Sequence, residues 1–274
     1  TFQGTPFMET VGHRRSHVTE TDLNDYRRII NSFKVDTAVV QDIIPPRSLA
    51  AIRDDTLAYL VAFYKRAEQE GRWPEIWRMP TMVMIPKTEP FKYRLIALLA
   101  TFYRVWARLA GEQVSVWMDK LKRVWVANGP KKAAEHAAYK VALDAEISEG
   151  NSNKVNVTIM ADLEKGFEKV HHSVIQMNAT IYDFRPETLA LALSMYTSPR
   201  RIKCGNAYSR VVRTVIGVLA GCPIAMGLLL PNVINPIESF WAKLPKQISS
   251  LWVYVDDIIM SITFDKADHT HMTS

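Results

Sequence analysis

The run LWVYVDDIIM, residues 251–260, constrains the fold of this chain more than any other stretch. It is apolar except for two adjacent aspartates, Asp256 and Asp257. Neighbouring carboxylates in an apolar strand repel each other and lose hydration. Apolar residues on both sides predict a strand, a turn that contains both aspartates, and a second strand. The pair is either an ordinary tight turn, where Asp is favoured, or part of a cation site.

A third aspartate follows another apolar strand. Residues 155–159 alternate between apolar and polar side chains, and Asp162 lies at the carboxyl end of this strand. Asp162 and Asp256 are 94 positions apart (256 − 162), so only the fold can bring them together. Converging carboxylates need a cation, and their hard oxygens select Mg²⁺ or Mn²⁺. The plain alternative for Asp162 is that it caps the following helix.

The rest of the pattern predicts an α+β fold with a mainly antiparallel sheet, because helices and strands are intermixed and the strands come in hairpins. Helices are expected at about 19–33, 48–69, 102–126, 131–149 and 186–196. The first would be capped by Thr19 or Thr21 and the second by Ser48, and Pro186 suits the first turn of the last. Strands are expected at 81–87, 92–99, 155–162, 251–255 and 258–264, with another hairpin around residues 205–206.

Composition excludes several classes of protein. The 274 residues are 48% hydrophobic and 23% charged, which is enough for one large or two small globular domains. The net charge of +6 suits a polyanionic partner. The uncharged segment 214–237 has the length of a membrane helix, but its prolines and glycines predict a loop and a buried, irregular helix instead.

Cys204 and Cys222 form no Cys-x-x-Cys pair and have no accompanying His cluster, which argues against a zinc site and a disulfide framework. A reducing compartment is therefore expected. The chain begins with Thr1 and has no charged-then-apolar leader. We expect a fragment of an intracellular protein of the cytoplasm or nucleus, not a secreted one.

Four motifs occur in order: IPK…YRLIAL, ADLEKGFEKV, GVLAGCP and YVDD. Together they resemble the fingers and palm of reverse transcriptases, in the style of non-LTR retrotransposons. The resemblance spans Pro80 to Phe264 and implies a right-hand polymerase fold with an antiparallel palm sheet packed on helices. It also implies a layout, which is a loose lead-in at 1–18, an N-terminal helical extension at 19–80, fingers at 81–150, and a truncated palm at 151–274 without a thumb.

The same resemblance implies roles for the acidic motif residues. Asp162, Asp256 and Asp257 would be catalytic and would hold two Mg²⁺ or Mn²⁺ ions, with Asp257 the weaker or structural ligand. The carbonyl oxygen of Leu163 would complete one metal shell. Phe167 would lie beneath the sugar of the incoming nucleotide and favour deoxynucleotides.

Residues around the nucleotide follow from the same motifs. Lys87 and Arg94 would grip the triphosphate, for which the forked, permanent charge of Arg is suited. The alternative is a solvated hairpin edge, which Lys often protects. Gly221 would let the backbone approach the nucleotide. The nucleotide-contacting glutamine of the family is Ala220 in this chain, and Cys222 and Leu95 replace the usual Ser and Pro.

The expected activity is that of an RNA-directed DNA polymerase, a nucleotidyltransferase that extends a DNA primer on an RNA template from deoxynucleoside triphosphates. An inactive, truncated copy that at most binds nucleic acid is the first alternative. An RNA-templated RNA polymerase is the second, which Phe167 opposes. Other basic side chains could follow a template or simply face solvent: Arg104, Arg108, Lys120, Lys122, Arg123, Lys131 and Lys132. No membrane partner is expected.

Overall fold

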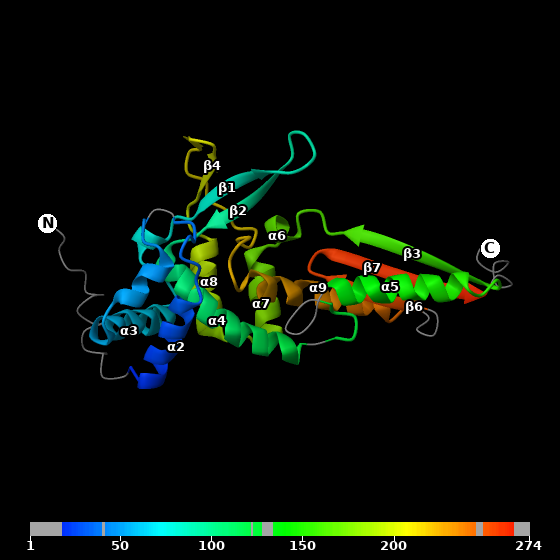
Figure 1. The fold of residues 1–274 in the computed structure, drawn as a ribbon, viewed down its shortest axis with the longest axis horizontal. Helices are drawn as coiled ribbons and strands as arrows, with labels where there is room; N and C mark the ends of the chain where they lie inside the picture. The colour runs from blue at the N-terminus through cyan, green and yellow to red at the C-terminus, as the bar shows by residue number, and fades with distance from the viewer. Residues whose placement is uncertain (1–17, 40–41, 122, 128–133, 245–248, 266–274) are drawn as a thin grey trace. The chain divides into compact units, whose positions relative to one another are not determined.

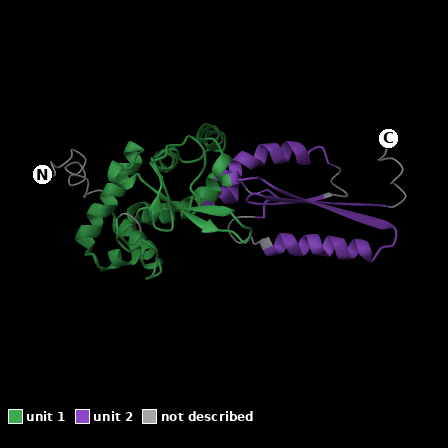
Figure 2. Cartoon of the chain, turned by 90° about the horizontal axis from the view of Figure 1, so that it is seen from above, with its two compact units in different colours: residues 1–114, 167–228 green, residues 115–166, 229–274 purple. Residues whose placement is uncertain are grey.

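The computed structural model describes residues 18–39, 42–121, 123–127, 134–244 and 249–265 (Figure 1). The chain forms two compact units, each built from two separate segments (Figure 2). Unit 1 comprises residues 1–114 and 167–228, and unit 2 comprises residues 115–166 and 229–274. These compact units do not test the boundaries that we predicted for the fingers and palm, which therefore stay predictions. Outside the described residues lie the predicted lead-in, except for Val18, and three of the basic residues: Lys122, Lys131 and Lys132.

Unit 1 begins with helix α2 (Glu20–Asn31), which starts as predicted. Thr19 and Asp22 form a reciprocal capping box, in which each side chain accepts a hydrogen bond from the backbone N–H of the other. The predicted start of the next helix at Ser48 is wrong. The Ser48 hydroxyl donates to the Pro45 carbonyl inside a short 3₁₀ helix, η2 (Pro46–Ala51), and α3 (Asp54–Glu70) begins later.

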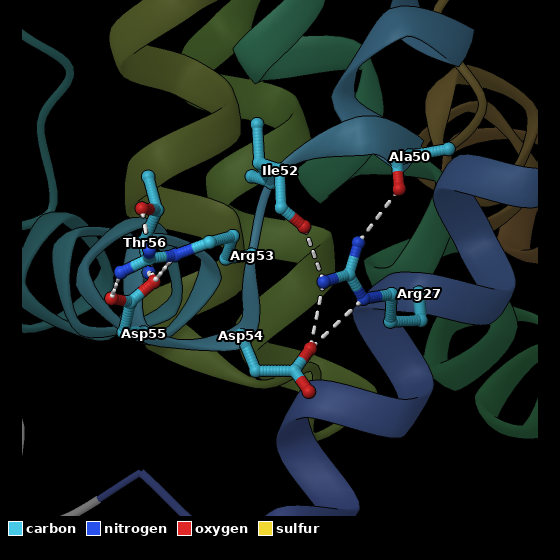
Figure 3. A network of polar contacts seen from close by, with 7 residues as sticks. All are labelled: Arg27, Ala50, Ile52, Arg53, Asp54, Asp55 and Thr56. Carbon is cyan, nitrogen blue, oxygen red and sulfur yellow. Dashed lines mark hydrogen bonds and ion pairs between the residues drawn. The ribbon is translucent and has the colours of Figure 1, made fainter.

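Arg27 fastens α2 to the chain that precedes α3 (Figure 3). Its guanidinium donates to the carbonyl oxygens of Ala50, at 2.9 Å, and Ile52, and pairs with the Asp54 carboxylate at 2.7 Å. The extended Ile52 carbonyl has no helical partner, so this contact satisfies a part-buried acceptor. The polar contacts thus join α2 to the segment just before α3 and to its first residue, Asp54.

The core of unit 1 is aromatic. Trp73 packs edge-to-face on Tyr103 and Trp106, with ring centroids 5.4 and 5.5 Å apart, and all three are buried. These rings come from the segment after α3 and from α4 (Thr101–Lys120). Unit 1 also contains the short η3 (Glu75–Trp77), α7 (His172–Ile181) and α8 (Pro186–Tyr196), and α8 has the predicted bounds.

A four-stranded sheet completes unit 1, with strand order β2-β1-β4-β5. Its strands are β1 (Thr81–Pro86), β2 (Tyr93–Leu98), β4 (Arg201–Cys204) and β5 (Ala207–Tyr208). The two predicted hairpins, β1–β2 and β4–β5, are both antiparallel. Strand β1 also pairs in parallel with β4, so this sheet is mixed.

Unit 2 contains an antiparallel sheet of β3 (Lys154–Asp162), β7 (Asp257–Asp265) and β6 (Ser249–Tyr254), in that order. Helix α5 (Ala134–Glu149) packs on β3 and β7. Two more helices have their bounds at Gly166–Lys169 (α6) and Ala225–Trp241 (α9). The α+β class is therefore confirmed. Within the described ranges, every helix is too short or too polar to span a bilayer.

The helix predicted at 102–126 ends at Lys120 instead. Residues 125–127 run beside β6, where Ala127 N–H donates to the Val253 carbonyl and Val253 N–H donates to the Trp125 carbonyl, both at 2.8 Å. These bonds require extended backbone, so they compete with the helix. Pairing with a strand more than 100 residues later has no local sequence signal.

Candidate active site

The β6–β7 hairpin places Asp256 in a two-residue turn. Tyr254 and Asp257 are the last paired residues, and Val255 and Asp256 connect them. Val255 has φ 58°, the positive value that the first residue of such a turn requires. For a β-branched residue this conformation costs on the order of 1–3 kcal/mol. Asp257 belongs to β7 and not to the turn, which corrects the prediction that both aspartates lie in the turn.

Strand β3 brings the third carboxylate to this hairpin. Asp162 is the residue opposite Asp257 in the β3–β7 ladder. The N–H of Leu163 donates to the Asp256 carbonyl at 2.9 Å and ties the end of β3 to the turn. One carboxylate oxygen from each of Asp162, Asp256 and Asp257 lies within 4.8 Å of the others. The three aspartates therefore meet, although they come from two distant segments.

The three carboxylates carry like charges at close range. Among the described residues, no Lys or Arg forms an ion pair with these three carboxylates. Asp162 and Asp257 are exposed and Asp256 is half-buried. Partial burial, followed by the charges of Asp256 and Asp162, raises the pKa of Asp257 above its usual 3.8. A divalent cation would reverse this repulsion, and three carboxylate oxygens are a suitable donor set for Mg²⁺ or Mn²⁺.

Gly166 permits the close approach of the chain to Asp256, a feature that we did not predict. A Cβ at this position would lie 3.3 Å from the Asp256 Cβ, which is tighter than ordinary packing. The Gly166 N–H also donates to the Leu163 carbonyl at 2.9 Å. One lone pair of the carbonyl oxygen predicted to bind metal is thus already engaged, and the other is available.

An open hollow adjoins two of the three carboxylates. Asp162 and Asp257 line it with Tyr254, and the other lining residues are apolar. They come from α5 and the strand ends: Ala137, Ala138, Met160, Ala161, Ile258 and Ile259. The hollow therefore offers anionic oxygens beside an apolar wall within unit 2.

Phe167, in unit 1, is half-buried and packs with the glycine-rich loop. Its carbonyl accepts a hydrogen bond from Val218 N–H at 2.8 Å, and the Val170 carbonyl accepts one from Gly217 N–H at 2.7 Å. A Cβ on Gly217 would lie 2.9 Å from the Glu168 carbonyl oxygen, and its φ is 86°. Glycine is required at position 217, although from the sequence we predicted roles in this loop only for Ala220 and Gly221.

The other end of this loop lies against β2. The Ala220 carbonyl accepts a bond from Ala97 N–H at 2.8 Å. Gly221 has φ 99°, and a Cβ there would come within 3.1 Å of the Ala97 carbonyl oxygen. The close approach at Gly221 is therefore to protein backbone in this structure. The nucleotide-binding roles of Ala220 and Gly221 stay predictions.

His172 also holds the loop, and we did not predict it. Its Nε2 lies 2.9 Å from the Gly217 carbonyl oxygen, and its Nδ1 is buried without a hydrogen-bond partner among the residues that the structure describes. Burial lowers the pKa of this imidazole below 6.5, and the charge of Arg200 acts in the same direction. The neutral ring is thus part of the loop packing.

Lys87 and Arg94 lie on the β1–β2 hairpin of unit 1, with exposed side chains. Arg94 pairs with Ile85 across the hairpin, and Lys87 N–H donates to the Lys92 carbonyl. In the described part of the chain neither side chain forms an ion pair, whereas Lys92 pairs with Glu89. Both are free to bind an anion, and their contact with a triphosphate stays a prediction.

Three of the other basic residues have structural partners. Arg104 and Arg108 lie over the Phe33 ring, with Cζ 5.6 and 4.0 Å from its centroid, and Arg104 also donates to the Ala38 carbonyl. Arg123 forms an ion pair with Glu238. These contacts favour the structural interpretation over a template track.

Comparison with known proteins identifies a fold. No protein-family profile matches the sequence, and no curated protein does. Among solved structures, the chain is similar to an apo telomerase from Candida tropicalis truncated from its C-terminal domain, with a TM-score of 0.50 and 12% identity. The match covers 68% of this chain and 44% of that one. At this identity the likeness concerns the fold alone, which is polymerase-like and spans less than half the length of the telomerase chain.

Proposed function

We propose that this chain is the RNA-directed DNA polymerase domain of a retrotransposon-like element. The observation that carries the proposal is the convergence of Asp162, Asp256 and Asp257 at one end of the unit 2 sheet. The similarity in fold to a telomerase, itself a reverse transcriptase, supports the same reaction class. Fold alone does not determine function, so the aspartates are the decisive feature.

The reaction would join the 3′-oxygen of a DNA primer to the α-phosphorus of a deoxynucleoside triphosphate and release pyrophosphate. Bound Mg²⁺ or Mn²⁺ would stabilise the attacking and leaving oxygens of this in-line transfer. Asp162 and Asp256 would hold two ions, with Asp257 and the Leu163 carbonyl as supporting ligands. The anionic triad would also keep other anions out until the metal is bound.

Residues outside the aspartate triad would select and position the nucleotide. Lys87 and Arg94 are exposed, unpaired cations among the described residues, suited to a triphosphate. Phe167 would exclude a 2′-hydroxyl, which would favour deoxynucleotides and a DNA product on an RNA template. The glycine-rich loop at Ala220 and Gly221 would lie beside the nucleotide.

One observation favours a second candidate function, a copy that binds nucleic acid without turnover. Ala220 lacks the polar side chain that the resemblance places at this position. A non-catalytic domain would still bind a primer–template through its phosphates. Only the polymerase would extend a primer, so a primer-extension assay distinguishes the two candidate functions.

Primer extension on an RNA template with Mg²⁺ tests the proposal. The parent should incorporate deoxynucleotides in preference to ribonucleotides, and Phe167→Ala should reduce that preference. Asp256→Asn should lose extension by about two orders of magnitude or more, equivalent to roughly 2.7 kcal/mol. Extension by Asp256→Asn at the parental rate would refute the metal assignment. Binding of the primer–template without any extension by the parent would establish the second candidate.

A further inference from the structure

A long stretch of the chain has no acidic residue. Between Glu187 and Glu238 there are 50 residues without Asp or Glu, and five of them are basic. The five gather between residues 200 and 213, around the β4–β5 hairpin: Arg200, Arg201, Lys203, Arg210 and Arg213. The segment that contains this hairpin therefore has no acidic residue to balance its positive charge.

Strand register places part of this charge on one face of the unit 1 sheet. In the parallel pair, Val83 of β1 lies opposite Lys203, and in the hairpin Lys203 lies opposite Tyr208. Residues directly opposite share a face, and so do residues two apart along a strand. Arg201 and Tyr208 therefore lie on the same face as Lys203. We call this surface the hairpin face, defined by Arg201, Lys203 and Tyr208.

Arg94 extends this face across the sheet. It lies opposite Ile85, which is two residues from Val83 on β1. By the same alternation, Arg94 lies on the face that carries Lys203. The face thus has cationic side chains on both β2 and β4, with the apolar Val83 and Ile85 between them.

The hairpin face is available to a partner. Tyr208 is 56% exposed, and Arg201 is exposed as well. The Lys203 ammonium lies 5.7 Å from the Tyr208 ring centroid, so a cation sits beside an accessible aromatic ring. Within the described ranges, neither Arg201 nor Lys203 forms an ion pair, and the same holds for the exposed Arg210 and Arg213.

Arg200 is different from the others and is not part of this surface. It is half-buried, and its guanidinium donates to the Tyr196 carbonyl at the end of α8. Burial lowers its pKa. Arg200 therefore has a structural partner of its own, unlike the exposed Arg201, Arg210 and Arg213.

We infer that the hairpin face, with Arg210 and Arg213 beside it, binds single-stranded nucleic acid. Phosphates would contact the cations, and an unpaired base would stack on Tyr208. A duplex keeps its bases inside the stack, so the exposed ring favours a single strand. RNA and DNA share this chemistry. The proposed surface includes none of the three aspartates, and the inference does not depend on whether the chain polymerises.

Fluorescence anisotropy with labelled oligo(U) and oligo(dT) of about 15 nucleotides tests this inference in EDTA, which leaves the aspartates without metal. The double variant Arg201→Gln/Lys203→Gln should bind more weakly and reduce the slope of log affinity against log salt by about 1.4. Tyr208→Ser should weaken binding at least about fivefold, whereas Tyr208→Phe should retain it. Circular dichroism melting confirms that each variant is folded.

The matched control is Lys34→Gln/Lys154→Gln, which removes the same charge from exposed positions outside the β4–β5 hairpin. It should keep the parental salt slope. A preference for oligo(U) or oligo(dT) identifies the natural strand, and either supports the site. Equal losses in both double variants, an inert Tyr208→Ser, or equal competition by polyglutamate would overturn it. Binding is measured in EDTA and involves no catalysed step, so failure of catalysis leaves this test unaffected.

Discussion

Asp162 and Asp257 lie directly opposite each other in the β3–β7 ladder, although 95 positions separate them in the chain (257 − 162). Like charges directly opposite in an antiparallel pair are destabilising. Here a third carboxylate, that of Asp256, adds to the repulsion. The arrangement costs stability in the absence of a cation, and this cost makes the site measurable without any assay of activity.

Without metal, the stability of the protein should depend on pH through Asp257. The folded-state pKa of Asp257 is raised above 3.8, so the folded protein holds this proton more tightly than the unfolded chain does. The contribution of Asp257 to stability is therefore complete below 3.8 and is lost as pH rises through its raised folded-state pKa. Asp257→Asn should remove this part of the fall. Urea unfolding in EDTA at pH values on both sides of 3.8 measures it, and identical pH profiles for parent and variant would contradict the account.

Divalent cations should stabilise the folded protein. At a hundredfold excess over the dissociation constant, Mg²⁺ or Mn²⁺ should add about 2.7 kcal/mol to the free energy of unfolding. Asp256→Asn should lose most of this gain. Asp265→Asn is the matched control, because it removes a carboxylate from the far end of β7, opposite Lys154. Thermal unfolding over a Mg²⁺ titration gives the comparison, and equal gains in both variants would exclude the triad as the metal site.

Gly166→Ala tests the close packing against Asp256. The added Cβ would lie 3.3 Å from the Asp256 Cβ and should displace the turn. Because Ala favours the helix that begins here, the net change in stability should stay within about 1 kcal/mol. The affinity for Mg²⁺, measured from the stabilisation that it produces, should fall several-fold. Gly150→Ala, whose Cβ would meet nothing closer than 3.5 Å, should bind Mg²⁺ as the parent does.

His172 should make the glycine-rich loop sensitive to acid. Its folded-state pKa lies below 6.5, so its contribution is complete above 6.5 and is lost as pH falls through the folded-state pKa. His172→Gln can still donate to the Gly217 carbonyl, but it has no proton to gain. Urea unfolding at about pH 7.5 and about pH 5 should show a smaller loss in the variant. An equal loss in both proteins would place the acid sensitivity elsewhere.

Local signals in the sequence were enough to predict several elements. The Thr19 cap, Pro186 at the first turn of α8, and the alternation that ends at Asp162 depend on neighbouring residues only. The Asp256–Asp257 hairpin follows from the same local pattern. These elements explain why the α+β class and the candidate carboxylates could be predicted.

Other features depend on contacts between distant segments. Helix α4 stops early because residues 125–127 pair with Val253, and β4 joins β1 in parallel. Gly166 is an ordinary glycine until Asp256 is placed beside it. Arg27 reaches the Ile52 carbonyl, just before α3 starts, from a helix earlier in the chain. No periodicity or turn signal within one segment encodes such contacts.

Single-nucleotide extension of a DNA primer on an RNA template, with and without Mg²⁺, tests the central claim most directly. The account predicts Mg²⁺-dependent incorporation by the parent and by Asp265→Asn, and a loss of about two orders of magnitude or more in Asp162→Asn. Incorporation by Asp162→Asn at the parental rate would contradict the claim that the three aspartates form the catalytic site.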